Sequence, residues 1–417
     1  MLRLPMKPAT LAMISSLCAT AWMGIALGGC DAPPGATADE PAGSAAADAR
    51  SLNELLSDPD IYGRARALAL RIPQLGPEAT PEIEAAIQRG LATMSIADFE
   101  LLMRAWASRD PRAASLWAIG LGAPRFRNSA VDIAVEAWAQ IDPSAALEGV
   151  VFALHSPDRE LSQSAQRAIV RGWFRKDRGE LETYIRGLGD GVAQQRSLLA
   201  YSLALWEAEG GAAVIRWAEA LPSDPARFKQ AAFRQVSTAL AWADPEAARR
   251  WCETHCDGPF GKSLRTAIVR TWIHEGENAA EVLEWVARAP DGPSRVHALR
   301  VGYETWAMQD RRGALDWMKA KIEEGPAPWV RLLFGAYARQ LSVTAPAEAI
   351  VWAEQIEAPQ AREEMLVRIA RRWLREDRAA AEAWLNRSSL SESARAKARN
   401  LDAPDYLPEG PPALAGS

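Results

Sequence analysis

The chain has 417 residues, of which 48% are hydrophobic and 24% are charged, and its formal net charge at pH 7 is −5. This composition supplies enough apolar residues for a buried core. The acidic balance disfavours nucleic-acid binding, because the phosphate backbone is bound through clustered lysine and arginine.

The first 29 residues have the pattern of a signal peptide. Arg3 and Lys7 form a positively charged start, and an uncharged, largely apolar run extends from Leu11 to Ala26. Residues 1–29 contain these two of the 48 basic residues and no acidic residue. Their removal leaves 46 basic against 53 acidic residues and a net charge of −7. We therefore exclude this segment from the predicted fold.

The apolar run ends in LGGC, residues 27–30, which resembles the lipobox of bacterial lipoproteins. The resemblance implies cleavage before Cys30 and lipidation of its sulfur, with acyl chains such as palmitate. Buried acyl chains contribute about 0.8 kcal/mol per methylene group, so several of them anchor a protein without a transmembrane helix. A plain secretory signal and an uncleaved anchor are the alternatives. The expected location is a membrane of the bacterial cell envelope, facing the periplasm.

Residues 31–51 are rich in Ala, Gly, Pro and Asp and contain hardly a large apolar side chain. Such a segment cannot bury enough surface to order itself. Residues 30–60 are therefore predicted to be a disordered tether, residues 61–402 a repeat domain, and residues 403–417 a disordered tail.

Aromatic residues recur between residues 61 and 402 in two columns eleven positions apart, as in WASRDPRAASLW, residues 106–117. The first column is Trp106, Trp138, Trp173, Trp206, Leu240, Trp272 (shifted by two residues), Trp306, Leu341 and Trp373. The second column is Trp117, Gly149, Tyr184, Trp217, Trp251, Trp285, Trp317, Trp352 and Trp384, at spacings of 32–35 residues. This period predicts an all-α superhelix (solenoid) of about nine to ten helical hairpins.

An Asp or Asn stands four residues after most members of the first column. These residues are Asp110, Asp142, Asp177, Asp244, Asn278, Asp310 and Asp377. Both types are preferred N-caps, because the side-chain oxygen accepts a bond from an unpaired amide of the first turn. At four repeats a proline follows this position as the first helical residue: Pro111, Pro143, Pro245 and Pro346. Each repeat is thus predicted to have a helix A that ends near the first column and a helix B that begins after the cap.

The ends of the array are predicted to differ from its middle. Residues 62–91 lack tryptophan and are expected to form a capping repeat, with Thr80 as a helix cap and Pro81 at the first helical position. Residues 391–400 are expected to form a final half-repeat.

A helix pair every 32–35 residues resembles tetratricopeptide-like and HEAT-like α-solenoids over about residues 60–400. The chain lacks the Gly-Tyr pair and the Ala–aromatic–Ala series of tetratricopeptide repeats. Its Asp-Pro/Trp form looks more like repeats of bacterial envelope proteins. The resemblance implies an extended surface that binds a protein or peptide.

The tryptophans are predicted to pack in the core, since residues at one place in every repeat normally face the neighbouring repeat. Each buried indole removes about 150–250 Å² from water, which contributes at most on the order of 4–6 kcal/mol at ~25 cal/mol per Å². The alternative is an exposed aromatic row that stacks on sugars or holds a proline-rich peptide.

Two glycine-rich stretches suggest phosphate binding but are predicted to be turns between hairpins. CDGPFGKS, residues 256–263, ends like a P-loop, but a P-loop needs glycine in place of Cys256 and a preceding strand. GLGDG, residues 187–191, falls at the equivalent turn two repeats earlier.

Cys252 and Cys256 are the two thiols that remain once Cys18 is removed and Cys30 is lipidated. A disulfide, two free core thiols, and a metal site that includes His255 are three interpretations of this pair. The four histidines show no metal-ligand spacing, and no cofactor or catalytic motif is recognised. No metal or cofactor is therefore expected.

Five arginines stand two residues before the first column: Arg104, Arg171, Arg270, Arg339 and Arg371. Two helical positions rotate a side chain by about 200°, so they are expected to point away from the packed tryptophans. They then form a ridge for acidic peptides or anionic glycans. The alternative is that each offsets the helix macrodipole and stays solvated.

Together these features predict a membrane-anchored envelope scaffold or binding protein that presents a helical-repeat surface to a protein or peptide. The alternative is an envelope enzyme that acts on peptidoglycan or another glycan through a concave acidic site. A deep cleft with two close carboxylates would favour the enzyme, and a broad open groove would favour the scaffold.

Overall fold

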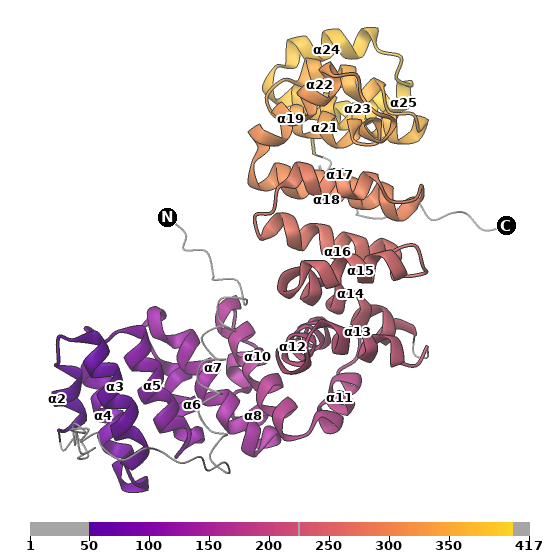
Figure 1. Ribbon diagram of the computed structural model, residues 1–417. Coiled ribbons are helices and arrows are strands. Elements are labelled where there is room, and N and C mark those ends of the chain that lie inside the picture. The colour runs from indigo at the N-terminus through magenta and orange to yellow at the C-terminus, as the bar shows by residue number, and fades with distance from the viewer. Residues whose placement is uncertain (1–49, 224–225, 403–417) are drawn as a thin grey trace, which may run out of the picture. The chain divides into compact units, whose positions relative to one another are not determined.

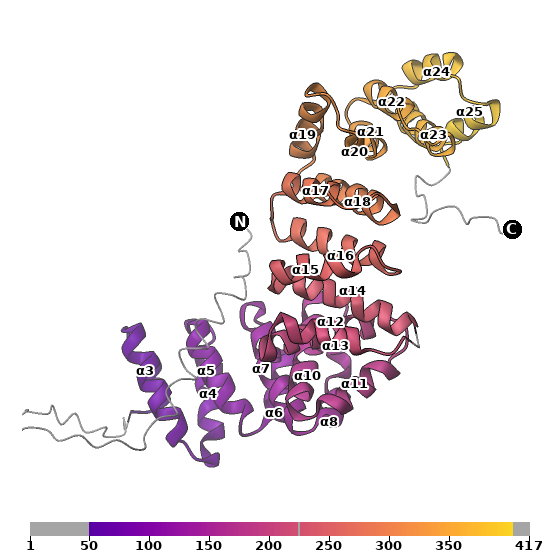
Figure 2. The same ribbon diagram turned by 45° about the vertical axis from the view of Figure 1, so that its right-hand side comes forward.

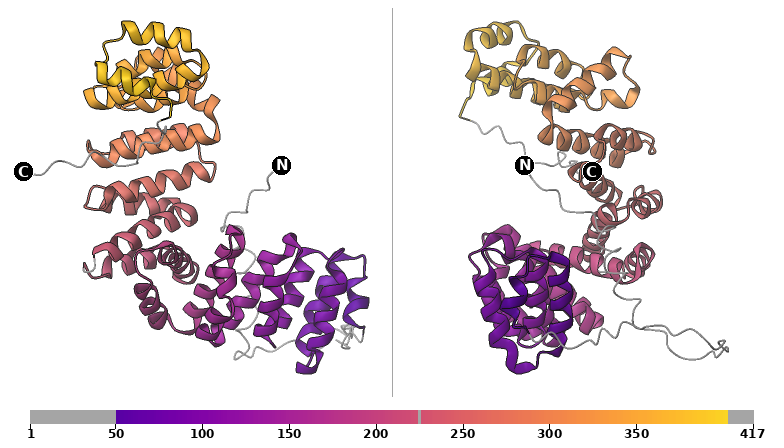
Figure 3. Two further views of the ribbon diagram at one scale, coloured as in Figure 1. Left: turned by 180° about the vertical axis from the view of Figure 1, so that it is seen from behind. Right: turned by 60° about the vertical axis from the view of Figure 1, so that its left-hand side comes forward.

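The computed structural model describes residues 50–223 and 226–402, and all regular elements in these ranges are helices (Figure 1). The chain divides into two units, an N-terminal unit up to Ala239 and a C-terminal unit from Leu240. Within each unit the helices pack against neighbours in chain order, which Figure 2 and, from behind, Figure 3 also show. The predicted all-α solenoid is therefore confirmed.

The N-terminal unit contains α2 (Leu52–Leu56), α3 (Ile61–Arg71), α4 (Thr80–Gly90), α5 (Ile96–Ala107), α6 (Pro111–Gly120), α7 (Pro124–Ile141), α8 (Pro143–Gly149), α9 (Val151–Leu154), α10 (Arg159–Lys176), α11 (Arg178–Gly187), α12 (Val192–Glu209) and α13 (Gly211–Ala220). Two 3₁₀ helices, η1 (Ile72–Gln74) and η2 (Pro77–Ala79), connect α3 to α4. Helix α14 (Ala226–Ala243) runs across the boundary between the units.

The C-terminal unit continues with α15 (Pro245–His255), α16 (Gly261–His274), α17 (Ala279–Ala287), α18 (Pro293–Gln309), α19 (Arg311–Glu323), α20 (Pro328–Arg331), α21 (Phe334–Leu341), α22 (Pro346–Glu354), α23 (Pro359–Glu376), α24 (Arg378–Arg387) and α25 (Glu392–Arg399). Successive A helices contact one another across repeats, as α16 does α18. The predicted final half-repeat is confirmed as α25.

The cap residue between the two columns joins the helices of each hairpin. The amide of Asp110 donates to the carbonyl of Trp106 at 2.9 Å and closes helix A, while its side chain accepts from the amide of Ala113 at 2.9 Å and caps helix B. The other six predicted Asp and Asn caps also accept from amides of the following helix. At the glycine of this column, Gly210, the backbone takes φ 80°, a region that favours glycine.

The tryptophans are buried or half-buried, which bears out packing over an exposed aromatic row, although the two columns meet within a hairpin and not only against the neighbouring repeat. Of the sixteen within the described residues none is exposed, and five are no more than 7% exposed: Trp106, Trp138, Trp173, Trp251 and Trp272. The two columns meet inside a hairpin, with ring centroids 5.3 Å apart for Trp106 and Trp117 and 5.5 Å apart for Trp306 and Trp317. The indoles therefore fill the seam between helices A and B.

Gly149 shows why one member of the second column lacks a side chain. A Cβ atom at this position would lie 2.2 Å from the indole of Trp138, which already occupies the seam. Helix B is correspondingly short here, and the separate helix α9 follows it.

The folded body begins earlier than the predicted boundary at residue 61. Helix α2 packs against α3 and α4, and its Leu52 and Leu55 are fully buried. Ser51 and Glu54 form a capping box at its start. Residues 50–60 are therefore not part of a disordered tether; the rest of that segment, the signal peptide with Cys30, and the tail from residue 403 lie outside the described residues.

The predicted cap of the first repeat is also wrong. Helix α4 begins at Thr80 itself, so Ala79 is the N-cap and Pro81 the second helical residue. The Thr80 hydroxyl donates instead to the carbonyl of Pro77 at 2.9 Å, within the preceding 3₁₀ turn.

Both glycine-rich stretches are turns between hairpins, as predicted. CDGPFGKS joins α15 to α16, and the buried Arg265 holds this turn by donating to Asp257 at 2.9 Å and to Ser294 at 3.3 Å. Cys252 and Cys256 are joined in a disulfide at the end of α15, and both are buried. GLGDG lies between α11 and α12.

Candidate functional site

The described residues contain no metal-binding cluster. No group of three or more His, Cys, Asp or Glu side chains in residues 50–223 and 226–402 is placed to hold a metal ion. His255 packs its ring on Trp251, with the centroids 4.0 Å apart, and the neighbouring cysteines are bonded to each other. In the same ranges, no helix combines the length and the apolar character needed to cross a membrane.

The predicted ridge of five arginines is not a free cationic surface. Arg171 forms an ion pair with Glu136 at 2.9 Å, and Arg339 pairs with Glu304. Both glutamates occupy the same position in the preceding repeat, and equivalent positions on packed helices lie about 8–10 Å apart, within reach of such a pair. Arg371 donates to the carbonyl of Lys397 at 2.8 Å.

The other two members of the ridge, Arg104 and Arg270, are exposed and form no ion pair within the described part of the chain. One belongs to each unit. The charges of Arg171 and Arg339 are thus balanced by glutamates, and the ridge for acidic partners stays a prediction.

A charged groove lies where α5, α7 and α10 of the N-terminal unit meet. It encloses about 430 Å³, and its charged lining residues are Glu100, Arg104, Asp132, Glu136, Arg171 and Arg175. Three acids and three bases line it, so its charges balance. Small-molecule pockets are mostly apolar, and this lining does not match that pattern.

Asp132 is a largely buried carboxyl of the charged groove. Its burial raises its pKa, and the nearby charge of Glu136 adds to this effect, while Arg167 and Arg171 oppose it. Each of these arginines approaches an Asp132 oxygen to 3.6 Å. The groove thus holds two carboxylates, Asp132 and Glu136, within one network of arginines.

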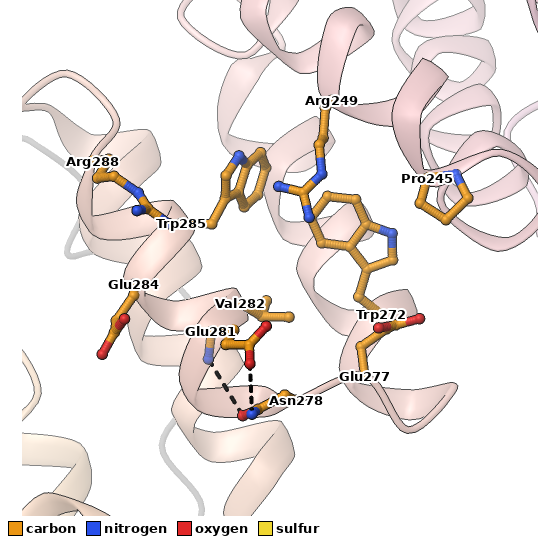
Figure 4. Close-up of a pocket in the computed structure, with 10 residues that line it drawn as sticks. All are labelled: Pro245, Arg249, Trp272, Glu277, Asn278, Glu281, Val282, Glu284, Trp285 and Arg288. Carbon is orange, nitrogen blue, oxygen red and sulfur yellow. Dashed lines mark hydrogen bonds between the residues drawn. The ribbon is translucent and has the colours of Figure 1, made fainter.

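A second site, which we call the aromatic pocket, is formed by α15, α16 and α17 of the C-terminal unit (Figure 4). The indoles of Trp272 and Trp285 meet edge to face, with centroids 4.9 Å apart and planes at 63°. The guanidinium of Arg249 lies 4.9 Å from the Trp272 ring and 5.8 Å from the Trp285 ring. Such cation–π contacts contribute about 0.5–1 kcal/mol at exposed sites and more when desolvated.

The aromatic pocket coincides with a departure from the repeat pattern. Trp272 is the first-column member that is shifted by two residues, and the turn that follows it is correspondingly longer. Gly276 takes φ 85° in this turn, and the amide of Glu277 donates to the carbonyl of Trp272 at 3.0 Å. Asn278 then caps α17. The shift was visible in the sequence, but its consequence for the surface was not.

Three acidic and two basic side chains line the aromatic pocket, and Glu284 among them is paired with Lys321 at 3.5 Å. Glu277, Glu281 and Glu284 line it together with Arg249 and Arg288 (Figure 4). The amide group of Asn278 donates to Glu281 at 3.0 Å, which fixes that carboxylate at the pocket edge. Trp272 is itself fixed, because its indole N–H donates to the carbonyl of Ala241 at 3.1 Å.

The size of the aromatic pocket decides what it can hold. Its volume is about 190 Å³, whereas sites for drug-sized ligands usually enclose about 300–1,000 Å³. A cavity of this size suits a single amino-acid side chain presented by a larger partner. Trp285, half-buried, and Arg249 supply the apolar and polarisable surface for that contact.

Comparison with protein-family models, with curated proteins and with solved structures yielded no match to this chain.

Proposed function

We propose that this chain is a lipid-anchored protein of the bacterial cell envelope that binds a protein or peptide partner through its helical repeats. The anchor is inferred from the LGGC motif that ends in Cys30. The observation that carries the binding function is the convergence of Arg249, Trp272 and Trp285 around a side-chain-sized pocket.

The charge of the rim suggests the chemistry of the partner. Three glutamates face Arg249 and Arg288 in the lining, and Glu284 is also paired with Lys321 at 3.5 Å, so Glu281 is the carboxylate that we assign to a basic residue of the partner. This differs from the acidic partner expected from the arginine column, because Arg171 and Arg339 are already neutralised by glutamates. Aromatic and arginine side chains in well-packed pockets often dominate binding energy at protein interfaces.

Crosslinking of the lipidated protein in its native envelope, with the captured partner identified and quantified, tests this proposal. Trp285→Ala should reduce capture of that partner about 10-fold or more, because loss of an interface anchor commonly costs about 2 kcal/mol. Trp384→Ala is the matched control, since Trp384 is also half-buried and holds the same column position in α24. Equal losses in both variants would mean that the effect comes from packing and would contradict the assigned pocket.

A glutamate-to-glutamine variant tests the charge of the pocket rim in the same experiment. Replacement of Glu281 by Gln should weaken capture most strongly at low ionic strength, because exposed charges are screened by salt. The exposed Glu323, which lies outside the pocket, provides a matched Glu→Gln control. Equal capture by the wild type and by Glu281→Gln at low ionic strength would refute a basic partner segment.

One observation favours a second function, cleavage of peptidoglycan or another glycan. Glycoside hydrolysis commonly uses two carboxyl groups, one of them with a raised pKa, and the charged groove contains Asp132 beside Glu136. The ion pairs of Glu136 with Arg171 and Arg175 weigh against this function. Release of soluble fragments from purified peptidoglycan by the wild-type protein, and its loss in Asp132→Asn, would establish it; no release by the wild type would remove it.

A further inference from the structure

The two ends of the helical array differ in the surface that they present to solvent. Helix α3, at the N-terminal end, exposes three large apolar side chains: Ile61 at 61%, Tyr62 at 88% and Leu70 at 55%. Helix α25, at the other end, has no large apolar residue in its sequence ESARAKAR. Terminal repeats of soluble arrays usually have a polar outer face, so the outer face of α3 is the exception.

The exposed residues of α3 lie on one side of the helix. At about 100° per residue, Ile61, Tyr62, Ala69 and Leu70 fall within one half of the helix surface, together with Arg66. The opposite side carries the buried Ala67 and Leu68, which pack into the N-terminal unit. We call this exposed half the α3 face.

The chemistry of the α3 face fits the boundary between lipid headgroups and acyl chains. Aliphatic side chains enter the acyl region, a tyrosine is favoured at the interface, and arginine keeps its charge among the headgroups. Arg66 is the exposed charge of this face. The acidic residues at the start of the helix already have partners, since Asp58 pairs with Arg50 at 3.2 Å and Asp60 caps α3.

The position of the α3 face in the chain brings it close to the proposed anchor. Cys30 precedes Arg50, the first described residue, by 20 positions. A chain of that length reaches at most about 66–72 Å. A lipid on Cys30 therefore keeps α3 near the bilayer surface and raises its effective concentration there.

We propose that the α3 face is a second membrane contact, which docks the N-terminal unit on the bilayer in which Cys30 is anchored. This inference rests on the proposed lipid anchor. The acyl chains on Cys30 already hold the chain at the bilayer, and the α3 face adds a contact that fixes the orientation of the N-terminal unit there. Docking holds the first repeats at the membrane surface, so the repeat array is presented from a fixed end.

A thiol probe at Tyr62 tests this docking in the full mature chain. With Cys30 lipidated and Cys252 bonded to Cys256, Tyr62→Cys carries the reactive thiol for a polarity-sensitive dye. The labelled protein is reconstituted into vesicles of phosphatidylethanolamine and phosphatidylglycerol, and the dye is challenged with an aqueous quencher. Ser393→Cys, at an exposed position of α25, is the matched control.

Two samples are compared: the lipidated protein in vesicles, and the unlipidated Cys30→Ser protein in detergent-free solution. Docking predicts that the dye at position 62 is quenched at least 5-fold less in the vesicle sample. The dye at position 393 should show no such change. Equal quenching at both positions in protein that floats with the vesicles would overturn the docking and leave the anchor intact. Failure of the protein to carry lipid on Cys30 would instead refute the anchor.

A triple variant separates docking from self-association. Ile61→Ser, Tyr62→Ser and Leu70→Ser combined should lower vesicle binding of the unlipidated protein at least 10-fold and leave its helical content unchanged, because all three side chains are exposed. Unchanged vesicle binding would overturn the proposal. A dimer of the wild-type protein in sedimentation, lost in the triple variant, would assign the α3 face to a second copy and would also overturn it.

Discussion

Replacement of Trp106 by Ala tests the role of the tryptophan seams most sharply. Trp106 lies in α5, is 2% exposed, and packs against Trp117 of α6 with ring centroids 5.3 Å apart. Burial of its indole, about 150–250 Å², stabilises the fold by at most about 4–6 kcal/mol. Measured Trp→Ala changes in cores cost about 3–5 kcal/mol.

The indole N–H of Trp106 lowers this expectation. It is buried and has no hydrogen-bond partner among the described residues, and an unsatisfied buried donor costs about 1–3 kcal/mol. The alanine variant removes that penalty along with the burial, so we expect a loss near about 3 kcal/mol. Trp106→Phe retains much of the apolar contact and also removes the N–H, so its loss should be less than half as large.

Site-resolved hydrogen exchange is the appropriate assay, because a repeat array does not unfold as one cooperative unit. A loss of about 3 kcal/mol corresponds to roughly a 100-fold increase in opening, at 1.4 kcal/mol per tenfold change. The increase should appear in α5, α6 and α7 and be absent from α23 to α25. Tyr62→Ala is the control, since this side chain is 88% exposed and its loss should change stability by no more than about 0.5 kcal/mol. Unchanged exchange around Trp106 would refute the seam as a source of stability.

Three further predictions concern the caps, the charged groove and the disulfide. Asp142→Ala, which removes the cap that accepts from Ala145, should raise exchange in α8 by the equivalent of about 1 kcal/mol, whereas Asp142→Asn should change little. Because the pKa of Asp132 is raised above its unfolded value, its carboxyl takes up a proton on folding, and its contribution to stability should increase as the pH falls through its folded pKa. Asp132→Asn should therefore be at least as stable as the wild type at pH 7, and the free energy of unfolding of the wild type should gain on that of the variant below about pH 5. A wild-type advantage in unfolding free energy that grows with pH would contradict this. Replacement of both Cys252 and Cys256 by Ala should lower stability by no more than about 2 kcal/mol, because the closed loop is short; a larger loss in denaturant unfolding would show that the bond does more than close that loop.

The helical hairpins were predictable from the sequence because their signals are local and repeated. Asp110 and Asp142 act as caps through amides only three residues away, and Trp106 and Trp117 meet within one hairpin. By contrast, α2 has five residues and two buried leucines, too few for any period to be visible. The predicted start of the fold was therefore about ten residues late.

The candidate sites depend on how adjacent repeats pack against each other. A single column of residues in the sequence does not reveal this packing. The pairing of Arg171 with Glu136 follows from the contact of α10 with α7, and it changes a predicted cationic ridge into a neutral network. The aromatic pocket arises where Trp272 is displaced by two residues from its column, and a displacement this small does not predict a pocket. Apolar exposure on α3 became visible only once the buried side of that helix was known.

The mass of the N-terminal peptide of the protein purified from its own membrane tests the proposed anchor most directly. A lipid anchor predicts a peptide that begins at Cys30 and carries the added mass of a diacylglyceryl group, with no trace of residues 1–29. An unmodified Cys30, or a chain that retains those residues, would contradict the lipid anchor on which both the proposed function and the docking of α3 depend.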